Sequence, residues 1–301
     1  MSKLLSLCIP TYGVSEWVLP VLDSIYNQNV SDDLFEVVIT DNGKNELFEN
    51  DLLPYMNKHN NLIYKKTDAY SFLNEIESYK VASGDFIKFV NHRTLMVDGS
   101  INYLLEFVNK YNGEKPFVYF TQGELKDGKQ TILNTFDEFV NKLSYWSSWS
   151  TGMAFWKEDF NKVMNLNVSD FNELFPHTNI LFCCRNKNKY IVDDKFLLKE
   201  MEIEAKRKGK YDLFYAFCVE YPAIILDLLR SNDISIDTFS NVLDSNLDFI
   251  TTLYFDYVYR KKECSYDVSN YANTIEVFYS DKELKKRFRR LRRKKIINKI
   301  F

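Results

Sequence analysis

The feature that most constrains this chain is a regular alternation of short apolar runs and amphipathic segments over residues 4–90. Four runs have the length and the nearly continuous hydrophobicity of buried strands: Leu4–Ile9, Phe35–Thr40, Leu62–Lys66 and Asp85–Val90. The segments between them carry apolar residues at helical spacing: 16–27, 47–58 and 71–82. This order predicts right-handed βαβ units and an α/β fold around a mainly parallel sheet. Pro54 is expected to break the second helix.

Polar residues stand at the carboxyl ends of three of these strands. They are Thr11-Tyr12, Asp41-Asn42 and Asn91-His92-Arg93. In open α/β sheets the ligand binds outside the carboxyl ends of the strands, so these residues predict a ligand site along one edge. Each group taken singly also fits an ordinary turn or strand exit. Taken together, they favour the ligand site.

Composition and cysteine usage exclude several classes of protein. With 46% hydrophobic residues the chain can bury a large core, and its 301 residues suit one large or two modest domains. The five cysteines show no C-x-x-C spacing, which argues for free thiols in a reducing compartment and against a zinc site. The start lacks a signal-peptide layout and no run reaches about 18 apolar residues, so we expect a cytoplasmic protein that does not span a membrane.

The second half of the chain changes from mixed to helical texture. Strands are predicted at 117–121 and 190–192, with helices at 100–112 and 137–143. From Phe196 onward, apolar residues at helical spacing predict four further helices: Phe196–Lys208, Leu213–Leu229, Ile236–Asn241 and Leu247–Arg260. A separate helical region therefore follows the sheet.

The last stretch, 281–301, is strongly basic. It holds eleven Lys and Arg against two acidic residues, whereas the whole chain has a formal net charge of −3. Leu284, Phe288 and Leu291 lie on one helical face, so the stretch predicts a basic amphipathic helix at an anionic membrane surface. A solvated charged helix is the alternative. Nucleic-acid binding fits poorly, because the rest of the chain is acidic and shows no other basic patch.

Three blocks near the start resemble the family 2 inverting glycosyltransferases. They read L-S-L-C-I-P-T-Y-G at 5–13, V-V-I-T-D-N-G at 37–43 and A-S-G-D-F-I-K-F-V at 82–90, in the order and at the distances of that family. The resemblance extends more weakly to Asp194. It implies a GT-A fold and hexosyl transfer from a nucleotide-activated sugar, with a UDP-sugar as the expected donor.

The resemblance also implies roles for the residues at the sheet edge. Backbone groups of Pro10 and Thr11 and the ring of Tyr12 would line the pocket for a pyrimidine base. The Asp41 carboxylate would accept a hydrogen bond from the base or the ribose. Four further positions complete the implied nucleotide site: Asn42, Asn74, Asn91 and His92. A structural hydrogen-bonding role is the alternative for an isolated histidine.

The chain departs from this family at the residues that would hold a metal. The family ends its fourth strand in Asp-x-Asp, which binds Mg²⁺ or Mn²⁺, whereas this chain has Asn91-His92-Arg93. A hard divalent cation prefers anionic oxygen ligands, and a guanidinium would repel it. Either Arg93 supplies the positive charge for the leaving diphosphate, or catalysis is lost. We favour the first interpretation, and binding of Mg²⁺ or Mn²⁺ stays open through three other carboxylates: Asp98, Asp193 and Asp194.

The segment 145–152 brings two tryptophans and several hydroxyls together. Aromatic rings offer an apolar face for stacking and hydroxyls offer hydrogen bonds, so Trp149 and Thr151 are candidates for a donor- or acceptor-sugar wall. By the resemblance, Gly152 would let the sugar approach the backbone. A hydrophobic anchor for a loop is the alternative.

An inverting transfer needs a general base for the acceptor hydroxyl, and the resemblance places that base within residues 168–178. The candidates in this segment are Asp170, His177 and Glu173. His177 titrates near neutral pH, while Asp170 could instead cap a helix. The sequence ranks Asp170 and His177 equally, with Glu173 third.

These expectations combine into one prediction. Residues 1–195 form a GT-A domain for nucleotide-sugar binding and catalysis, 196–280 a helical region for acceptor binding or homo-oligomerisation, and 281–301 a tail on the inner face of the cell membrane. The acceptor would be a lipid-linked glycan or a surface polymer precursor, as in capsule, lipopolysaccharide or teichoic acid assembly. A catalytically silent nucleotide- or glycan-binding protein is the alternative.

Overall fold

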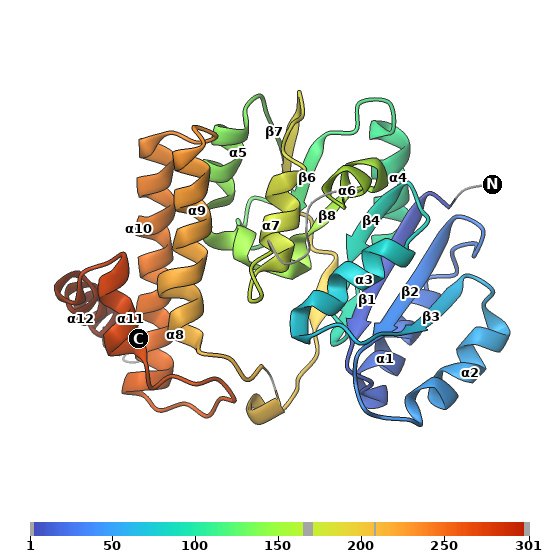
Figure 1. Ribbon diagram of the computed structural model, residues 1–301, viewed down its shortest axis with the longest axis horizontal. Helices are drawn as coiled ribbons and strands as arrows, with labels where there is room; N and C mark the ends of the chain where they lie inside the picture. The colour runs from blue at the N-terminus through green and yellow to red at the C-terminus, as the bar shows by residue number, and fades with distance from the viewer. Residues whose placement is uncertain (1–2, 165–170, 208, 298–301) are drawn as a thin grey trace. The chain divides into compact units, whose positions relative to one another are not determined.

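A five-stranded sheet forms the centre of the amino-terminal part of the chain (Figure 1). Its order is β3-β2-β1-β4-β8, with β1 Leu5–Thr11, β2 Phe35–Asp41, β3 Leu62–Lys66, β4 Phe86–Phe89 and β8 Ala154–Trp156. The first four strands pair in parallel, and β8 runs antiparallel to β4. Every residue of β2 is buried, which explains its nearly continuous apolar sequence. The predicted α/β fold with a mainly parallel sheet is confirmed.

The structure is a computed structural model that describes residues 3–164, 171–207 and 209–297. It divides the chain into two compact units. The first consists of Met1–Thr135 with Trp146–Met201, and the second of Phe136–Tyr145 with Glu202–Phe301.

Helices accompany the strands of the first unit. They are α1 Ser15–Tyr26, α2 Phe48–Lys58, a 3-10 turn Ser71–Leu73 leading into α3 Asn74–Val81, α4 Ser100–Tyr111, α6 Lys157–Val163 and α7 Pro176–Cys183. Contrary to expectation, Pro54 does not break α2. Pro54 and Asn50 are both exposed, so water can reach the Asn50 carbonyl that loses its helical partner.

Two smaller groups of strands complete the first unit. β6 Phe117–Phe120, β9 Tyr190–Asp193 and β7 Gln130–Leu133 form one sheet, and β5 Thr94–Met96 pairs antiparallel with β10 Leu198–Glu200. The prediction of a helix over Phe196–Lys208 is wrong, because this stretch contains β10. Pairing with a strand far earlier in the chain overrides the local helical spacing.

The regular elements of the second unit, within its described residues, are helices, and an isolated bridge joins Asp212 to Asp267. Its elements are α5 Phe136–Leu143, α8 Leu213–Tyr215, a π-helical turn Ala216–Glu220, α9 Tyr221–Arg230, α10 Ile236–Leu253, a second π-helical turn Tyr254–Tyr259, α11 Tyr271–Thr274 and α12 Asp281–Ile297. Two separate helices predicted over 236–260 are in fact continuous, since α10 runs directly into the second π-helical turn.

The basic helix α12 packs its apolar face inside the second unit. Leu284 is 1% exposed. The Phe288 ring lies against the rings of Tyr254, Phe255 and Tyr259, with centroid distances of 5.3, 6.1 and 5.1 Å. The predicted amphipathic membrane helix would need this apolar face to be free for lipid. The face is instead packed inside the protein. Within the described ranges, no helix is long and apolar enough to cross a bilayer.

Candidate functional site

The ends of β1 and β2 form the edge at which the sequence predicts a nucleotide. Thr11 and Asp41 are partners in the strand register, and the Asn42 N–H donates to the Thr11 carbonyl at 3.1 Å. The Asp41 side chain is fully buried. Its carboxylate accepts hydrogen bonds from the Gly43 N–H at 2.7 Å and from Lys66 Nζ at 2.6 Å. Asp41 thus fixes the turn that follows β2 and carries a cationic partner.

The Tyr12 ring stands exposed above this edge. It is 47% exposed and packs edge-on against Trp17 and His92. A Cβ added at Gly43 would lie 1.8 Å from the Tyr12 carbonyl oxygen, so only glycine allows the two turns to approach this closely. Tyr12 thus presents an exposed ring at this edge, whereas the Asp41 carboxylate is buried against Gly43 and Lys66, and Pro10 lies half-buried within β1.

Asn74 and Asn42 act within the protein at this edge. The buried Asn74 amide donates to the carbonyls of Thr11 and Thr40 at 3.0 and 2.8 Å. The Asn42 amide donates to the carbonyl of Ala69 at 2.8 Å. Both side chains hold the strand ends in place. They would therefore help to bind a ligand indirectly, by positioning the backbone at this edge.

The tripeptide after β4 joins the same edge. His92 is 9% exposed, and its Nδ1 lies 2.8 Å from Thr11 Oγ1. Burial, together with the charge of Arg93, lowers the pKa of His92 to about 3, so the imidazole is neutral at physiological pH. The Asn91 side-chain oxygen accepts a hydrogen bond from the Arg93 N–H. The Arg93 guanidinium makes no hydrogen bond or ion pair with any residue that the structure describes, and its charge is free for a ligand.

The donor set of the tripeptide does not fit a divalent cation. Asn91 offers one neutral oxygen, which already accepts the Arg93 N–H, and a guanidinium stands beside it. Asp193 and Asp194 do not supply the missing ligands. Asp193 accepts from Tyr103 and Gln130, and Asp194 is bound by backbone N–H groups of a neighbouring turn. In the described part of the chain, no three His, Cys, Asp or Glu side chains converge on a metal position.

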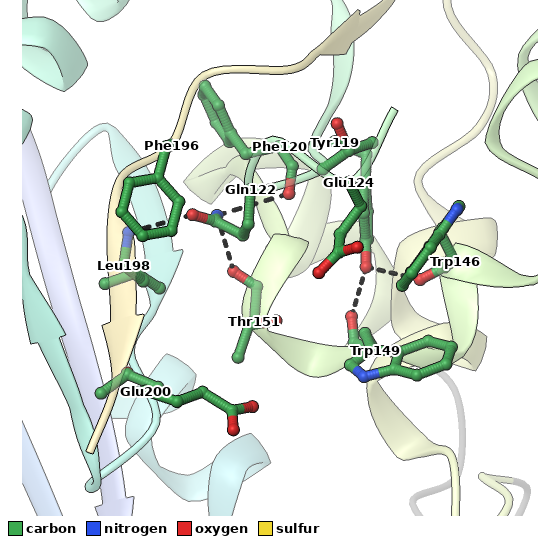
Figure 2. Close-up of a pocket in the computed structure, with 12 residues that line it drawn as sticks. Tyr119, Phe120, Gln122, Glu124, Trp146, Trp149, Thr151, Phe196, Leu198 and Glu200 are labelled. Atoms are coloured by element: carbon green, nitrogen blue, oxygen red, sulfur yellow. Dashed lines mark hydrogen bonds between the residues drawn. The ribbon is translucent and has the colours of Figure 1, made fainter. Parts of the chain in front are cut away.

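A cavity of about 140 Å³ begins at Thr94, the residue after Arg93 (Figure 2). Its walls combine aromatic rings, hydroxyls and carboxylates: Trp146, Trp149, Phe196, Thr94, Thr151, Glu124 and Glu200 are among its lining residues. The structure therefore brings the predicted Trp149 and Thr151 together. It adds Glu124, from the turn after β6, and Glu200, from β10. The sequence alone did not predict them, because neither element can be recognised as part of the cavity before the chain is folded.

Gly152 has a different role from the one that the resemblance implies. A Cβ at this position would lie 2.1 Å from the Tyr119 ring. That ring fills the space beside Gly152, and its hydroxyl lies 2.6 and 2.5 Å from the carbonyl oxygens of Trp146 and Trp149. Gly152 therefore makes room for a residue that positions both tryptophans, and it does not open the backbone to a sugar on that side.

A buried lysine lies directly behind the cavity wall. Lys88 points from β4 into the protein and is fully buried. Its ammonium group donates to the carbonyls of Phe89, Thr151 and Met153 at 2.9, 2.5 and 3.3 Å. Burial lowers the pKa of Lys88 to about 7. The sequence contains a sign of this buried lysine, because it stands within the otherwise apolar run F-I-K-F of a predicted strand.

The three predicted bases lie outside the cavity lining or outside the described residues. His177, on α7, is 9% exposed; its Nε2 lies 3.0 Å from the Ser148 carbonyl and its Nδ1 lies 3.8 Å from Glu75 Oε1. Burial lowers the pKa of His177 to about 4. Glu173 is exposed. Asp170 lies outside the described residues.

Comparisons with known proteins agree with this geometry. Residues 6–148 match the sequence model of the family described as Glycosyl transferase family 2. The crystal structure of S. aureus TarS 1-349 in complex with UDP-GlcNAc is similar at 16% sequence identity and a TM-score of 0.60, over 87% of this chain and 76% of that one. The mannosyltransferase PcManGT from Pyrobaculum calidifontis, in complex with GDP-Man and Mn²⁺, is similar at 14% identity and a TM-score of 0.52, over 81% and 68%. No curated protein sequence matches this chain.

The structural likeness establishes the fold, and the family match covers the strands and turns that build the edge and the tripeptide. Both comparisons agree with the three sequence blocks and with the parallel order of β3, β2, β1 and β4. Residues 6–148 therefore belong to a domain of Glycosyl transferase family 2, and the chain has the GT-A fold of its structural neighbours.

Proposed function

We propose that this chain transfers a hexose from a UDP-sugar to a hydroxyl of a glycan acceptor, with inversion at the anomeric carbon. One observation carries the proposal: Arg93 stands at the junction of the two halves of the site. The residue before it, His92, contacts Thr11 and Tyr12 at the nucleotide edge. The residue after it, Thr94, lines the aromatic cavity. A diphosphate between base and sugar would pass this junction.

The nucleotide edge suits a pyrimidine nucleoside. Tyr12 offers an exposed ring face. The Asp41 carboxylate is fully buried, so it would accept a hydrogen bond from the base or the ribose once Lys66 moves aside. Lys66, which is half-exposed and paired to Asp41, adds positive charge at the same place. We assign uridine because TarS, which has the same fold, was crystallised with UDP-GlcNAc.

Arg93 would stabilise the charge that develops on the leaving diphosphate. A guanidinium presents planar donors that match phosphate oxygens, and such preorganised charge lowers the barrier where negative charge grows. Since Arg93 has no side-chain partner among the described residues, it need not break an existing bond to do so. The tripeptide does not fit a cation, so no step is assigned to a metal.

Hexose recognition falls to the cavity next to Arg93. Trp149 offers a ring for stacking, and Thr151 offers a hydroxyl. Transfer also needs a group that takes the proton from the acceptor hydroxyl while its oxygen attacks the anomeric carbon. His177 lies against Ser148 and Glu75 and faces neither the cavity nor solvent, which makes it a poor candidate.

We place the reaction on the cytoplasmic face of the cell membrane, with a lipid-linked glycan or a surface polymer precursor as the acceptor. The exposed side of α12 supports this location: Lys282, Arg289 and Arg293 are exposed and make no ion pair with the described residues. Attraction of such charges to anionic lipids amounts to about 1 kcal/mol for each residue near the surface.

Donor binding and UDP release test this function. Isothermal calorimetry with UDP-GlcNAc and with GDP-mannose should show preference for the uridine nucleotide, and the protein should release UDP slowly in the absence of an acceptor. A ligand that binds the folded state also raises its melting temperature. Preference for GDP-mannose would contradict the assignment of the donor, and binding without any UDP release would favour a catalytically silent protein.

A further inference from the structure

A buried carboxylate organises the turn that carries Glu124. Asp194, at the end of β9, is 2% exposed. It accepts hydrogen bonds from Thr121 Oγ1 at 2.5 Å and from the N–H groups of Leu125, Asp127 and Gly128 at 3.0, 2.9 and 3.0 Å. These bonds hold the Asp194 pKa below its usual value despite burial. The turn over residues 121–128 is therefore fixed to the sheet beneath it.

Glu124 points from this turn into the cavity (Figure 2). Its carboxylate accepts no hydrogen bond and forms no ion pair within the described ranges. Partial burial and the charges of Asp194 and Glu200 raise the pKa of Glu124, although Lys126 opposes them. An unpaired carboxylate with a raised pKa accepts a proton more readily than an ordinary surface glutamate.

Glu200 is the other carboxylate that lines the cavity, and it enters from a different side. In the β5–β10 ribbon, Glu200 pairs directly with Thr94, the neighbour of Arg93. If Arg93 binds the diphosphate, Glu200 lies on the side of the leaving group. An inverting transfer needs its base on the opposite face of the sugar, where the acceptor arrives, and Glu124 approaches from a separate turn.

We propose that Glu124 is the catalytic base that deprotonates the acceptor hydroxyl. This assignment rests on the proposed transfer function. The acceptor oxygen forms a bond to the anomeric carbon while its proton passes to the Glu124 carboxylate. The bond between the anomeric carbon and the diphosphate oxygen breaks, and its electron pair leaves with UDP. Glu124 then returns its proton to solvent, and water can replace the acceptor in a slow hydrolysis of the donor.

The experiment compares Glu124→Gln with Glu200→Gln, which removes one carboxylate from the same cavity without changing its shape. UDP release from UDP-GlcNAc is followed in water, so that no acceptor has to be identified. Glu124→Gln should slow the release about 10²–10⁴-fold, the usual contribution of a general base, without changing the Kd for UDP-GlcNAc. Glu200→Gln should slow UDP release less than Glu124→Gln does. Glu124→Asp should recover part of the rate.

The pH profile separates catalysis from positioning. Release by the wild-type protein should rise with pH through the titration of Glu124, and Glu124→Gln should lack that rise. An equal or larger loss in Glu200→Gln, or a normal rate and profile in Glu124→Gln, would overturn the assignment. So would a wild-type protein that binds UDP-GlcNAc but never releases UDP. Failure of the wild-type protein to bind UDP-GlcNAc would instead overturn the proposed function itself and the assignment with it.

Discussion

Lys88 places an amino group in the core of the first unit, where none of the described carboxylates pairs with it. It is fully buried, and among the described residues its partners are the backbone carbonyls of Phe89, Thr151 and Met153. Carbonyl dipoles compensate part of the lost hydration, yet burial still lowers the Lys88 pKa from 10.5 to about 7. Because Thr151 lines the cavity, Lys88 also fixes the backbone of the cavity wall.

This depressed pKa predicts a specific dependence of stability on pH. Between pH 7 and 10.5 the unfolded chain holds a proton on Lys88 that the folded chain lacks, so the contribution of Lys88 to stability rises with pH and is lowest below pH 7. The free energy of unfolding of the wild type minus that of Lys88→Met should rise by at most ~1.4 kcal/mol per pH unit across this window. Denaturant melts measure it, and exposed Lys58→Met should give a flat difference. A flat curve for Lys88→Met would show that the amine is normally charged.

Asp41 is the residue for which sequence and structure can be compared most directly. Asp41→Asn keeps the shape of the side chain but weakens its acceptance of a hydrogen bond from the nucleoside. UDP should bind more weakly by about 1.5–3 kcal/mol, the range for a hydrogen bond to a charged group. Calorimetry below the melting temperature separates this loss from the stability lost with the Lys66 and Gly43 contacts. Unchanged affinity would reduce Asp41 to a residue of the turn.

At the scale of single residues, the sequence predicts site residues that directly follow strands. It does not predict site residues whose position depends on hydrogen bonds to distant parts of the chain. Thr11, Asp41 and His92 are brought together because they end neighbouring parallel strands, and strands of that kind are visible as apolar runs. Glu124 reaches its place only through Asp194, seventy residues later in the chain, by hydrogen bonds that no local pattern records.

At the scale of secondary-structure elements, the shortness of β5 and β10 explains why the sequence did not predict the part of the cavity wall that they form. β5 and β10 are three residues each, too short to show strand periodicity, and they form through each other. The apolar residues around Phe196 do have helical spacing, but the pairing of β10 with β5 makes this stretch a strand. The sequence therefore predicts the central sheet and the nucleotide edge, and it does not predict the cavity wall that β10 supplies.

The wall of the cavity depends on one close contact between elements. Gly152→Ala should destabilise the protein by about 1–3 kcal/mol, as overpacking does, because its Cβ would overlap the Tyr119 ring. Gly113→Ala is the matched control, since a Cβ there meets no atom within 4 Å. Thermal melts of both variants test the contact. Equal melting temperatures would mean that Tyr119 moves aside at little cost, and Trp146 and Trp149 would then lose their anchor.

The whole molecule combines the proposed donor site in one unit with a cationic helix in the other. Because the apolar face of α12 is buried in the second unit, any attraction to a membrane must come from its charges. Reversing exposed charges is therefore a cleaner change than removing the helix, which would uncover Tyr254 and Phe255.

Replacement of Arg289, Arg290 and Arg293 by Glu should abolish binding to vesicles that contain anionic lipid, and high salt should do the same for the wild type. The control replaces three exposed lysines of the first unit by Glu: Lys44, Lys58 and Lys110. Vesicle co-sedimentation gives the answer. Retained binding after reversal on α12, or equal loss in the control, would contradict a specific role for this helix.

The central claim is that Arg93 provides the positive charge that a metal provides in related enzymes. Turnover of the wild type and of Arg93→Ala is measured with chelator and with Mn²⁺ at about millimolar concentration, the range for weak divalent sites. The wild type should work equally well in both, and Arg93→Ala should be slower by about 10²–10³-fold in both. Arg93→Lys should recover only part of the rate, because it restores the charge without the planar donors. A wild-type enzyme that is inactive in chelator and restored by Mn²⁺ would contradict the account.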